Sequence, residues 1–227
     1  MNNRRPGQIA IGIGLLAWFV AVASLGPSGF FLIANRVFGL SAVQLAIFLP
    51  MAFFWALYFA VPSLAEFART ADLTFLVSVQ IVRILALSHI VCWGYGLMAG
   101  GFAIPVGLGN LLVSMLALSS IVAVANRSGQ WRARVWLLTT LGIAEFAMTI
   151  ALAVLGYFTT PLFFDPPQAA GGYITFATPP LSLFPTFAIP ALTLVHFVTL
   201  IAIRHQTSVE RSLPGLRGPV RSVQSGS

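Results

Sequence analysis

The chain has 227 residues, of which 58% are hydrophobic and 7% are charged. Soluble domains carry about 25% charged residues, so this chain cannot cover its surface in water and most of that surface must face lipid. The net charge of +7 rests on twelve arginines without a lysine, which excludes lysine Schiff-base chemistry and a Walker-type phosphate loop. A single cysteine, Cys92, excludes an internal disulfide and a multi-cysteine metal site.

Six apolar stretches of about 18–25 residues follow one another along the chain, and each is long enough to cross a membrane as a helix. They cover residues 8–26, 41–62, 74–99, 101–125, 135–158 and 181–204. Residues 1–204 are therefore predicted to form an all-α integral membrane bundle of six transmembrane helices. Residues 205–227 are rich in Ser, Gly, Pro and Arg, which predicts a disordered cytoplasmic tail.

Two segments between the predicted spans are more apolar than simple turns. In the first, Phe30, Phe31, Ala34, Val37 and Phe38 recur at helical spacing, which predicts a short interfacial helix. The second, residues 159–180, holds several prolines that disfavour a helix. It either folds back over the outer mouth of the bundle or packs on the lipid headgroups.

The arginines are unevenly distributed relative to the predicted spans. With the N-terminus in the cytoplasm, ten arginines fall in cytoplasmic segments, Arg36 falls outside, and Arg83 falls within a span. An excess of arginine in cytoplasmic loops is typical of membrane proteins. Both termini are therefore predicted to be cytoplasmic, with the chain in the inner (plasma) membrane of a bacterial cell.

Four polar residues in the predicted spans lie at similar depths. At ~1.5 Å per residue, Arg83, Glu145 and His196 lie roughly 12–15 Å from the cytoplasmic ends of their spans, and Asn110 lies near the midplane. A charge in hydrocarbon is costly unless it is paired or hydrated. We therefore expect an Arg83–Glu145 ion pair that faces the bundle interior, with His196 and Asn110 within reach.

Three further residues extend the same helix faces. Gln80 precedes Arg83 by one turn, and Thr149 follows Glu145 by one turn. In the last span, prolines near Thr193 leave backbone carbonyls without helical donors, and such backbone is tolerated where it faces a polar interior. The candidate site comprises Arg83, Glu145, His196, Asn110, Gln80, Thr149 and Thr193.

The candidate site has two interpretations that the residues leave open. Ionisable residues within spans often mark the paths of substrates, ions or protons, whereas small bundles also use polar contacts to hold helices together. A haem between His89 and His196 is disfavoured, because His89 lies ~10 Å farther from the cytoplasm and axial ligands approach one iron from opposite sides.

Motifs of known chemistry are missing from the sequence. It has no hydrolase, metalloprotease or nucleotide-binding motif, and no basic face interleaved with aromatics that would bind nucleic acid. We expect a non-enzymatic protein in the lipid bilayer, with no catalytic residue, metal site or cofactor. It either binds or conducts a small solute, ion or proton, or serves as an accessory or structural subunit of a membrane complex or homo-oligomer. A third alternative is an intramembrane haem- or pigment-binding protein.

Overall fold

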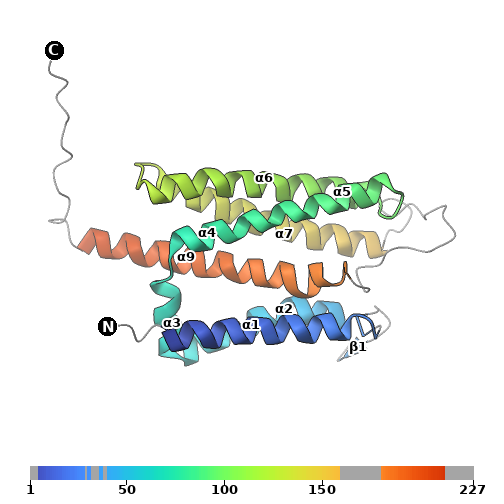
Figure 1. Ribbon diagram of the computed structural model, residues 1–227, viewed down its shortest axis with the longest axis horizontal. Coiled ribbons are helices and arrows are strands. Elements are labelled where there is room, and N and C mark those ends of the chain that lie inside the picture. The colour runs from blue at the N-terminus through green and yellow to red at the C-terminus, as the bar shows by residue number, and fades with distance from the viewer. Residues whose placement is uncertain (1–4, 29, 32–35, 38–39, 159–179, 213–227) are drawn as a thin grey trace, which may run out of the picture.

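The computed structural model describes residues 5–28, 30–31, 36–37, 40–158 and 180–212. Nearly all of them are helical, and the long helices lie side by side along one direction (Figure 1). The elements in chain order are α1 (Arg5–Leu25), β1 (Arg36–Val37), β2 (Leu40–Ser41), α2 (Ala42–Ala60), α3 (Pro62–Arg69), α4 (Leu73–Val79), η1 (Gln80–Ala86), α5 (Leu87–Gly94), α6 (Gly100–Ala125), α7 (Trp131–Phe158), η2 (Phe184–Ala188) and α9 (Ile189–Ser212).

Five of the described helical stretches are long and apolar enough to cross a membrane. The described apolar part of α1, Ile11–Leu25, is shorter than these. The fold is therefore all-helical and suits a membrane bundle. The five stretches are Ala42–Ala60, Leu73–Gly94, Gly100–Ala125, Trp131–Ala153 and Phe184–Ser208.

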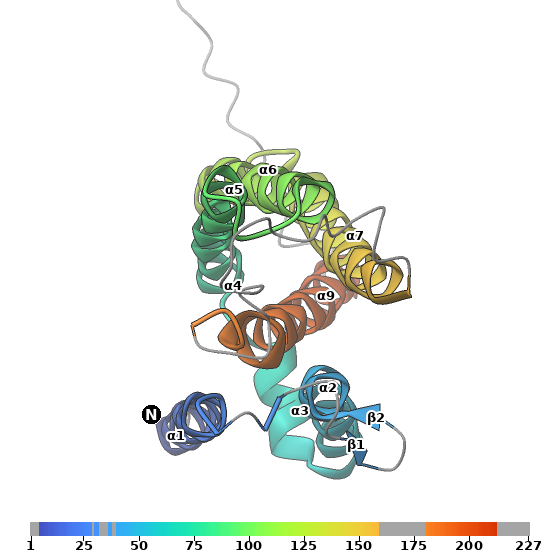
Figure 2. The same ribbon diagram turned by 90° about the vertical axis from the view of Figure 1, so that its right-hand side faces the viewer.

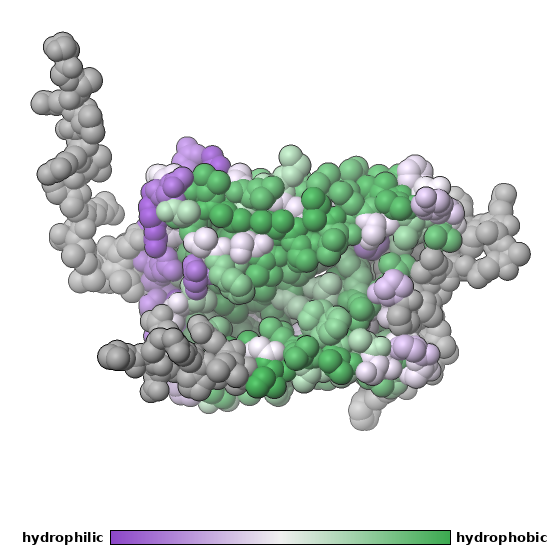
Figure 3. Space-filling view, in the orientation of Figure 1, coloured by the Kyte–Doolittle hydropathy of each residue, from purple (hydrophilic) through white to green (hydrophobic). Residues whose placement is uncertain are grey.

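The molecular surface also suits a lipid environment. On the face shown in Figure 3, hydrophobic residues cover the middle, and hydrophilic residues gather toward the two ends. Large apolar side chains are exposed in the middle of the apolar helices, where Leu85 and Met115 are 69% and 60% accessible. An apolar surface of this extent is unfavourable in water and favourable in hydrocarbon.

The helices form one bundle with a smaller group beside it. Viewed end-on, α4 and α5, α6, α7 and α9 surround a common interior, and α1, α2 and α3 lie on the outer side of α9 (Figure 2). Helix α6 packs on both α5 and α7, and α9 packs on α7, α4 and α2. Side chains that project inward from four helical segments can therefore meet in this interior.

One end of the bundle carries most of the described arginines. Helix α3, the turn between α6 and α7, and the last turns of α9 lie at this end (Figure 1). We call it the arginine-rich end. Its arginines include Arg69, Arg127, Arg132, Arg134 and Arg204.

Two of the predicted spans are not continuous α-helices. The third changes at Gln80 from α-helix into the 3₁₀ segment η1, which carries Arg83. This segment contains neither glycine nor proline, so we attribute its tighter winding to tertiary contacts and not to a local helix breaker. The last span begins with the π-helical turn η2, where Pro185 removes one backbone donor. Interruptions of this kind re-aim side chains and are frequent at functional sites.

The helix that we predicted over residues 30–38 is wrong. Arg36–Val37 pairs antiparallel with Leu40–Ser41. Phe31 is buried with Val22 of α1 and Ala42 of α2, so this side chain packs onto the helices instead of facing the headgroups.

The last helix also differs from its predicted bounds. We expected the last span to end at residue 204 and a disordered tail to follow, but α9 continues to Ser212. The first residues of the predicted tail are therefore helical. The predicted external segment 159–180 and the rest of the tail lie outside the described residues, apart from Pro180.

Candidate functional site

The interior of the bundle brings together a polar residue from each of four helical segments. Arg83 comes from η1, Asn110 from α6, Glu145 from α7 and His196 from α9. All four are buried, with accessible fractions of 6% or less. These positions bring one guanidinium, one carboxylate, one amide and one imidazole into a single contact network.

Arg83 is at the centre of this network. Its Nη2 donates to Oε2 of Glu145 in an ion pair, and its Nε donates to Oδ1 of Asn110 at 2.8 Å. Its Nη1 contacts the carbonyl oxygen of Gly142 at 3.3 Å and Nε2 of His196 at 3.2 Å. The five N–H groups of the guanidinium thus meet four acceptors, so little of its donor capacity remains.

The carboxylate of Glu145 is held by three donors. Besides Arg83, Nδ2 of Asn110 donates to its Oε1 at 2.6 Å, and Oγ1 of Thr149 donates to the same oxygen at 2.8 Å. The second hydrogen of the Asn110 amide goes to the carbonyl oxygen of Val106, at 2.9 Å. Both hydrogens and the oxygen of this amide are therefore used within the chain.

His196 receives a hydrogen bond from Arg83. A guanidinium can only donate, so Nε2 of His196 is the acceptor, and the proton of the neutral ring is on Nδ1. The close approach of α7 and α9 at this point depends on Gly142. A Cβ atom added there would overlap Nε2 of His196 and lie 3.0 Å from Nη1 of Arg83.

Five of the seven predicted site residues join this network, and two do not. Thr193 donates to the carbonyl oxygen of Ile189 in its own helix at 2.8 Å. Gln80 is buried one turn from Arg83, but both polar atoms of its amide have no hydrogen-bond partner among the described residues. The residues that join, which we call the polar cluster, are Arg83, Asn110, Glu145, Thr149 and His196.

Sequence reasoning missed two contributors to the site. The carbonyl of Gly142 is an acceptor for Arg83, and the ring of Phe146 lies against the guanidinium, with its centroid 3.8 Å from Cζ. A cation over an aromatic face is stabilised, most strongly where water is excluded. The available signal was the segment LGIAEF, in which Phe146 directly follows Glu145.

Apolar side chains enclose the polar cluster on both sides along the bundle. Toward the arginine-rich end, the largest core joins α4, α6, α7 and α9 through residues that include Leu76, Val113, Leu138 and Ile203. Toward the opposite end, Phe102, Val106 and their neighbours form a second core. The polar cluster is therefore separated from both ends of the bundle by packed apolar layers.

The described residues define a class of protein: a helical membrane protein whose central bundle is crossed by a buried, charge-paired hydrogen-bond network. Residues 40–204 match the model of a family described as a domain of unknown function (DUF8737). The match covers most of the chain, which therefore belongs to this family. It begins at β2, and so leaves α1 outside. The chain has no match among curated proteins or among solved structures.

Proposed function

We propose that the chain is a six-span protein of the bacterial inner membrane with both termini in the cytoplasm. Helix α1 has 21 residues, a length of about 31 Å at 1.5 Å per residue, which matches a hydrocarbon core of about 30 Å. It begins at the arginine-rich end, where α9 ends (Figure 1). The excess of arginine supports a cytoplasmic location for this end.

Within that membrane, we propose that the protein is a non-enzymatic accessory subunit, and that the polar cluster holds its own helices together. The observation that carries this proposal is the saturation of the network. Arg83 meets four acceptors within the chain, and the carboxylate of Glu145 meets three donors. A binding site needs polar groups left over for its ligand, and here few remain.

The packing around the polar cluster supports the same proposal. Gly109 lies so close to Glu145 that an added Cβ would be 2.9 Å from its Cγ, and Gly142 lies against His196. Small residues at helix contacts let backbones approach, and interhelical hydrogen bonds then fix their arrangement. The apolar cores on both sides leave the network enclosed.

A second candidate, passage or binding of a proton or small solute, is favoured by one observation. The amide of Gln80 and the hydroxyl of Thr139 are buried without a hydrogen-bond partner among the described residues. Each lies one turn from a residue of the network, Arg83 or Gly142, on the side of the arginine-rich end. Buried polar groups of this kind commonly bind water, which would bring a hydrated path next to the charges.

Reconstitution in vesicles separates the two functions. We expect wild type, Gln80→Leu and His196→Leu to give the same proton or solute flux between about pH 5 and 8, the range that histidine covers. The two variants should differ from wild type only in stability. A pH-dependent flux in wild type that both variants lose, while they still assemble, would contradict the structural role and support the second candidate.

The accessory role is tested by the mass of the protein extracted from its native membrane in mild detergent. We expect a particle larger than one chain with its detergent belt, containing either a partner protein or further copies of this chain. A single chain without a partner, together with the flux described above, would replace the accessory role by the second candidate.

A further inference from the structure

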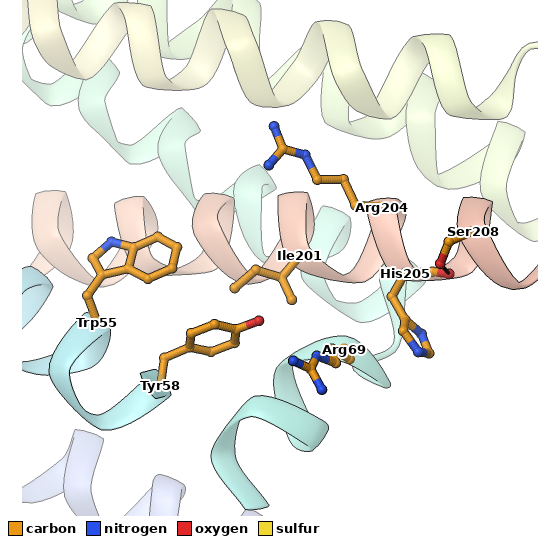
Figure 4. Close-up of a pocket in the computed structure, with 7 residues that line it drawn as sticks. All are labelled: Trp55, Tyr58, Arg69, Ile201, Arg204, His205 and Ser208. Carbon is orange, nitrogen blue, oxygen red and sulfur yellow. Dashed lines mark hydrogen bonds between the residues drawn. The ribbon is translucent and has the colours of Figure 1, made fainter. Parts of the chain in front are cut away.

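An open cavity of about 450 Å³ lies at the arginine-rich end, between α2, α3 and α9. Trp55 and Tyr58 enter it from α2, and Arg69 enters it from α3 (Figure 4). Helix α9 contributes Ile201, Arg204, His205 and Ser208. Along α9 the cavity lies beside the apolar core that contains Ala202 and Ile203, but it faces α2 and α3, whereas that core joins α9 to α4, α6 and α7. It is therefore a separate feature of the molecule.

The lining of this cavity is basic. Arg69, Arg204 and His205 supply cationic or hydrogen-bond-donating groups, and Figure 4 shows the side chains of Arg69 and His205 on the same side of α9. No carboxylate of the described residues forms an ion pair with any of the three. Glu66 lies one turn before Arg69 on α3, yet it makes no such contact. Among the side chains that the structure describes, the cavity therefore concentrates positive charge without a counterion.

The position of the cavity along the bundle fits the headgroup region of a bilayer. The residues that line it come from the end of α2 and from the last turns of the apolar stretch Phe184–Ser208. Trp55 and Tyr58 are the aromatic types that gather at the membrane interface. Helix α3 beside it is short, with Ala65 and Ala68 buried and Glu66 and Arg69 exposed, as in an interfacial amphipathic helix.

We propose that this cavity binds the phosphate headgroup of an anionic phospholipid. Arg69 donates to the phosphate oxygens through its planar fork of N–H groups, and the hydroxyl of Tyr58 and the imidazole of His205 supply further donors. Trp55 and Ile201 form the apolar side of the cavity, where the start of the acyl chains packs. The side chain of Arg204 points to the opposite side of α9 (Figure 4), where its Cζ lies 5.7 Å from the ring centroid of Trp136, so Arg69 is the arginine that faces the headgroup. Basic pockets between spans at the cytoplasmic face are suited to such headgroups.

The test measures lipid bound to the full-length protein by native mass spectrometry after exchange into detergent that contains phosphatidylglycerol or phosphatidylcholine. We expect retained phosphatidylglycerol and little phosphatidylcholine for wild type. Arg69→Gln should weaken phosphatidylglycerol binding about fivefold, the effect of one basic side chain near an anionic surface. Arg134→Gln, which removes the same charge at the same end but outside the cavity, should bind as wild type does.

A second variant tests the cavity without changing its charge. Ile201→Trp fills the space between α2 and α9 and should reduce phosphatidylglycerol binding, while circular dichroism and gel filtration show an intact fold. Equal losses in Arg69→Gln and Arg134→Gln would overturn the proposal, because they would indicate attraction by overall charge. Unchanged binding in Ile201→Trp would overturn it as well. Glycerol phosphate or inorganic phosphate that binds as tightly as the lipid would assign the cavity to a soluble phosphate compound instead.

Discussion

Arg83 and His196 can meet because Gly142 has no side chain. A Cβ atom at this position would overlap His196 and crowd Arg83, so helix α7 would have to move or the imidazole would have to leave the polar cluster. Overpacking of an interior costs about 1–3 kcal/mol. We expect Gly142→Ala to lower the free energy of unfolding in detergent by this amount.

Helix α1 offers a matched control for that substitution. A Cβ at Gly14 meets nothing within 4 Å, so Gly14→Ala should be neutral or slightly stabilising, as alanine favours a helix over glycine. Chemical unfolding followed by tryptophan fluorescence measures both variants. Equal effects of the two substitutions would show that the contact between α7 and α9 is not tightly packed.

At the residue scale, the depth of each residue in its span was enough to predict that Arg83, Glu145, Asn110 and His196 lie close together. The prediction works because a charge in hydrocarbon needs a partner at the same depth. The ion pair expected from the sequence is present in the structure. The contribution of the Gly142 carbonyl was not predictable, since helical carbonyls ordinarily bond within their own helix.

Two other predicted members of the site behave differently for local reasons. Thr193 donates to the carbonyl four residues earlier, which threonine commonly does within a helix, and its position on the polar face therefore does not bring it into the polar cluster. Gln80 lies in the 3₁₀ segment with Arg83, where residues three apart eclipse each other. Its amide is buried near Arg83, but it makes no hydrogen bond to any of the described residues.

At the scale of elements, the contact between α5 and α6 depends on a second glycine. A Cβ at Gly107 would lie 2.8 Å from Cδ1 of Ile90. We expect Gly107→Ala to destabilise the protein by about 1–2 kcal/mol, and Ile90→Ala in the same chain to restore part of that loss, because it removes the atoms in conflict. Detergent unfolding of both single variants and the double variant measures the coupling. Strictly additive losses would mean that the two side chains do not compete for the same space.

Hydropathy predicted the long elements because lipid selects for apolar length. The predicted ranges 41–62, 101–125 and 135–158 correspond to α2, α6 and α7, with ends that differ by at most four residues. Hydropathy carries no information about hydrogen-bond period, so η1 and η2 were not predicted. The helical spacing of aromatics around Phe31 was misleading, because Phe31 packs into a core with Val22 and Ala42 instead of facing the headgroups.

At the scale of the whole molecule, the central expectation is the orientation in the membrane. Single cysteines at Ser28 and Gln130, in a Cys92→Ser background, report it. Ser28 lies after α1 and Gln130 lies between α6 and α7, at opposite ends of the bundle (Figure 1). We expect an impermeant maleimide to label Ser28→Cys in intact cells, and Gln130→Cys only after permeabilisation. The reverse pattern would invert the proposed topology, and labelling of both from outside would remove one span.

The family match begins after α1 and covers the bundle together with α2 and α3. The matched residues 40–204 contain the five long apolar stretches apart from the last turn of the fifth, and they contain the whole polar cluster, whereas α1 lies before them. The residues that meet around Arg83 therefore all lie within the part of the chain that matches the family model.

The most direct test of the structural role is a double-mutant cycle on the ion pair. Arg83→Leu or Glu145→Leu leaves one charge buried without its partner, and each should lower the free energy of unfolding by about 3–5 kcal/mol. The double variant should lose less than either single variant, because two leucines leave no unpaired charge between η1 and α7. Unfolding in mixed detergent, monitored by tryptophan fluorescence, measures all four proteins. Losses in the double variant that equal the sum of the single losses would contradict the account, because they would show that Arg83 and Glu145 contribute independently.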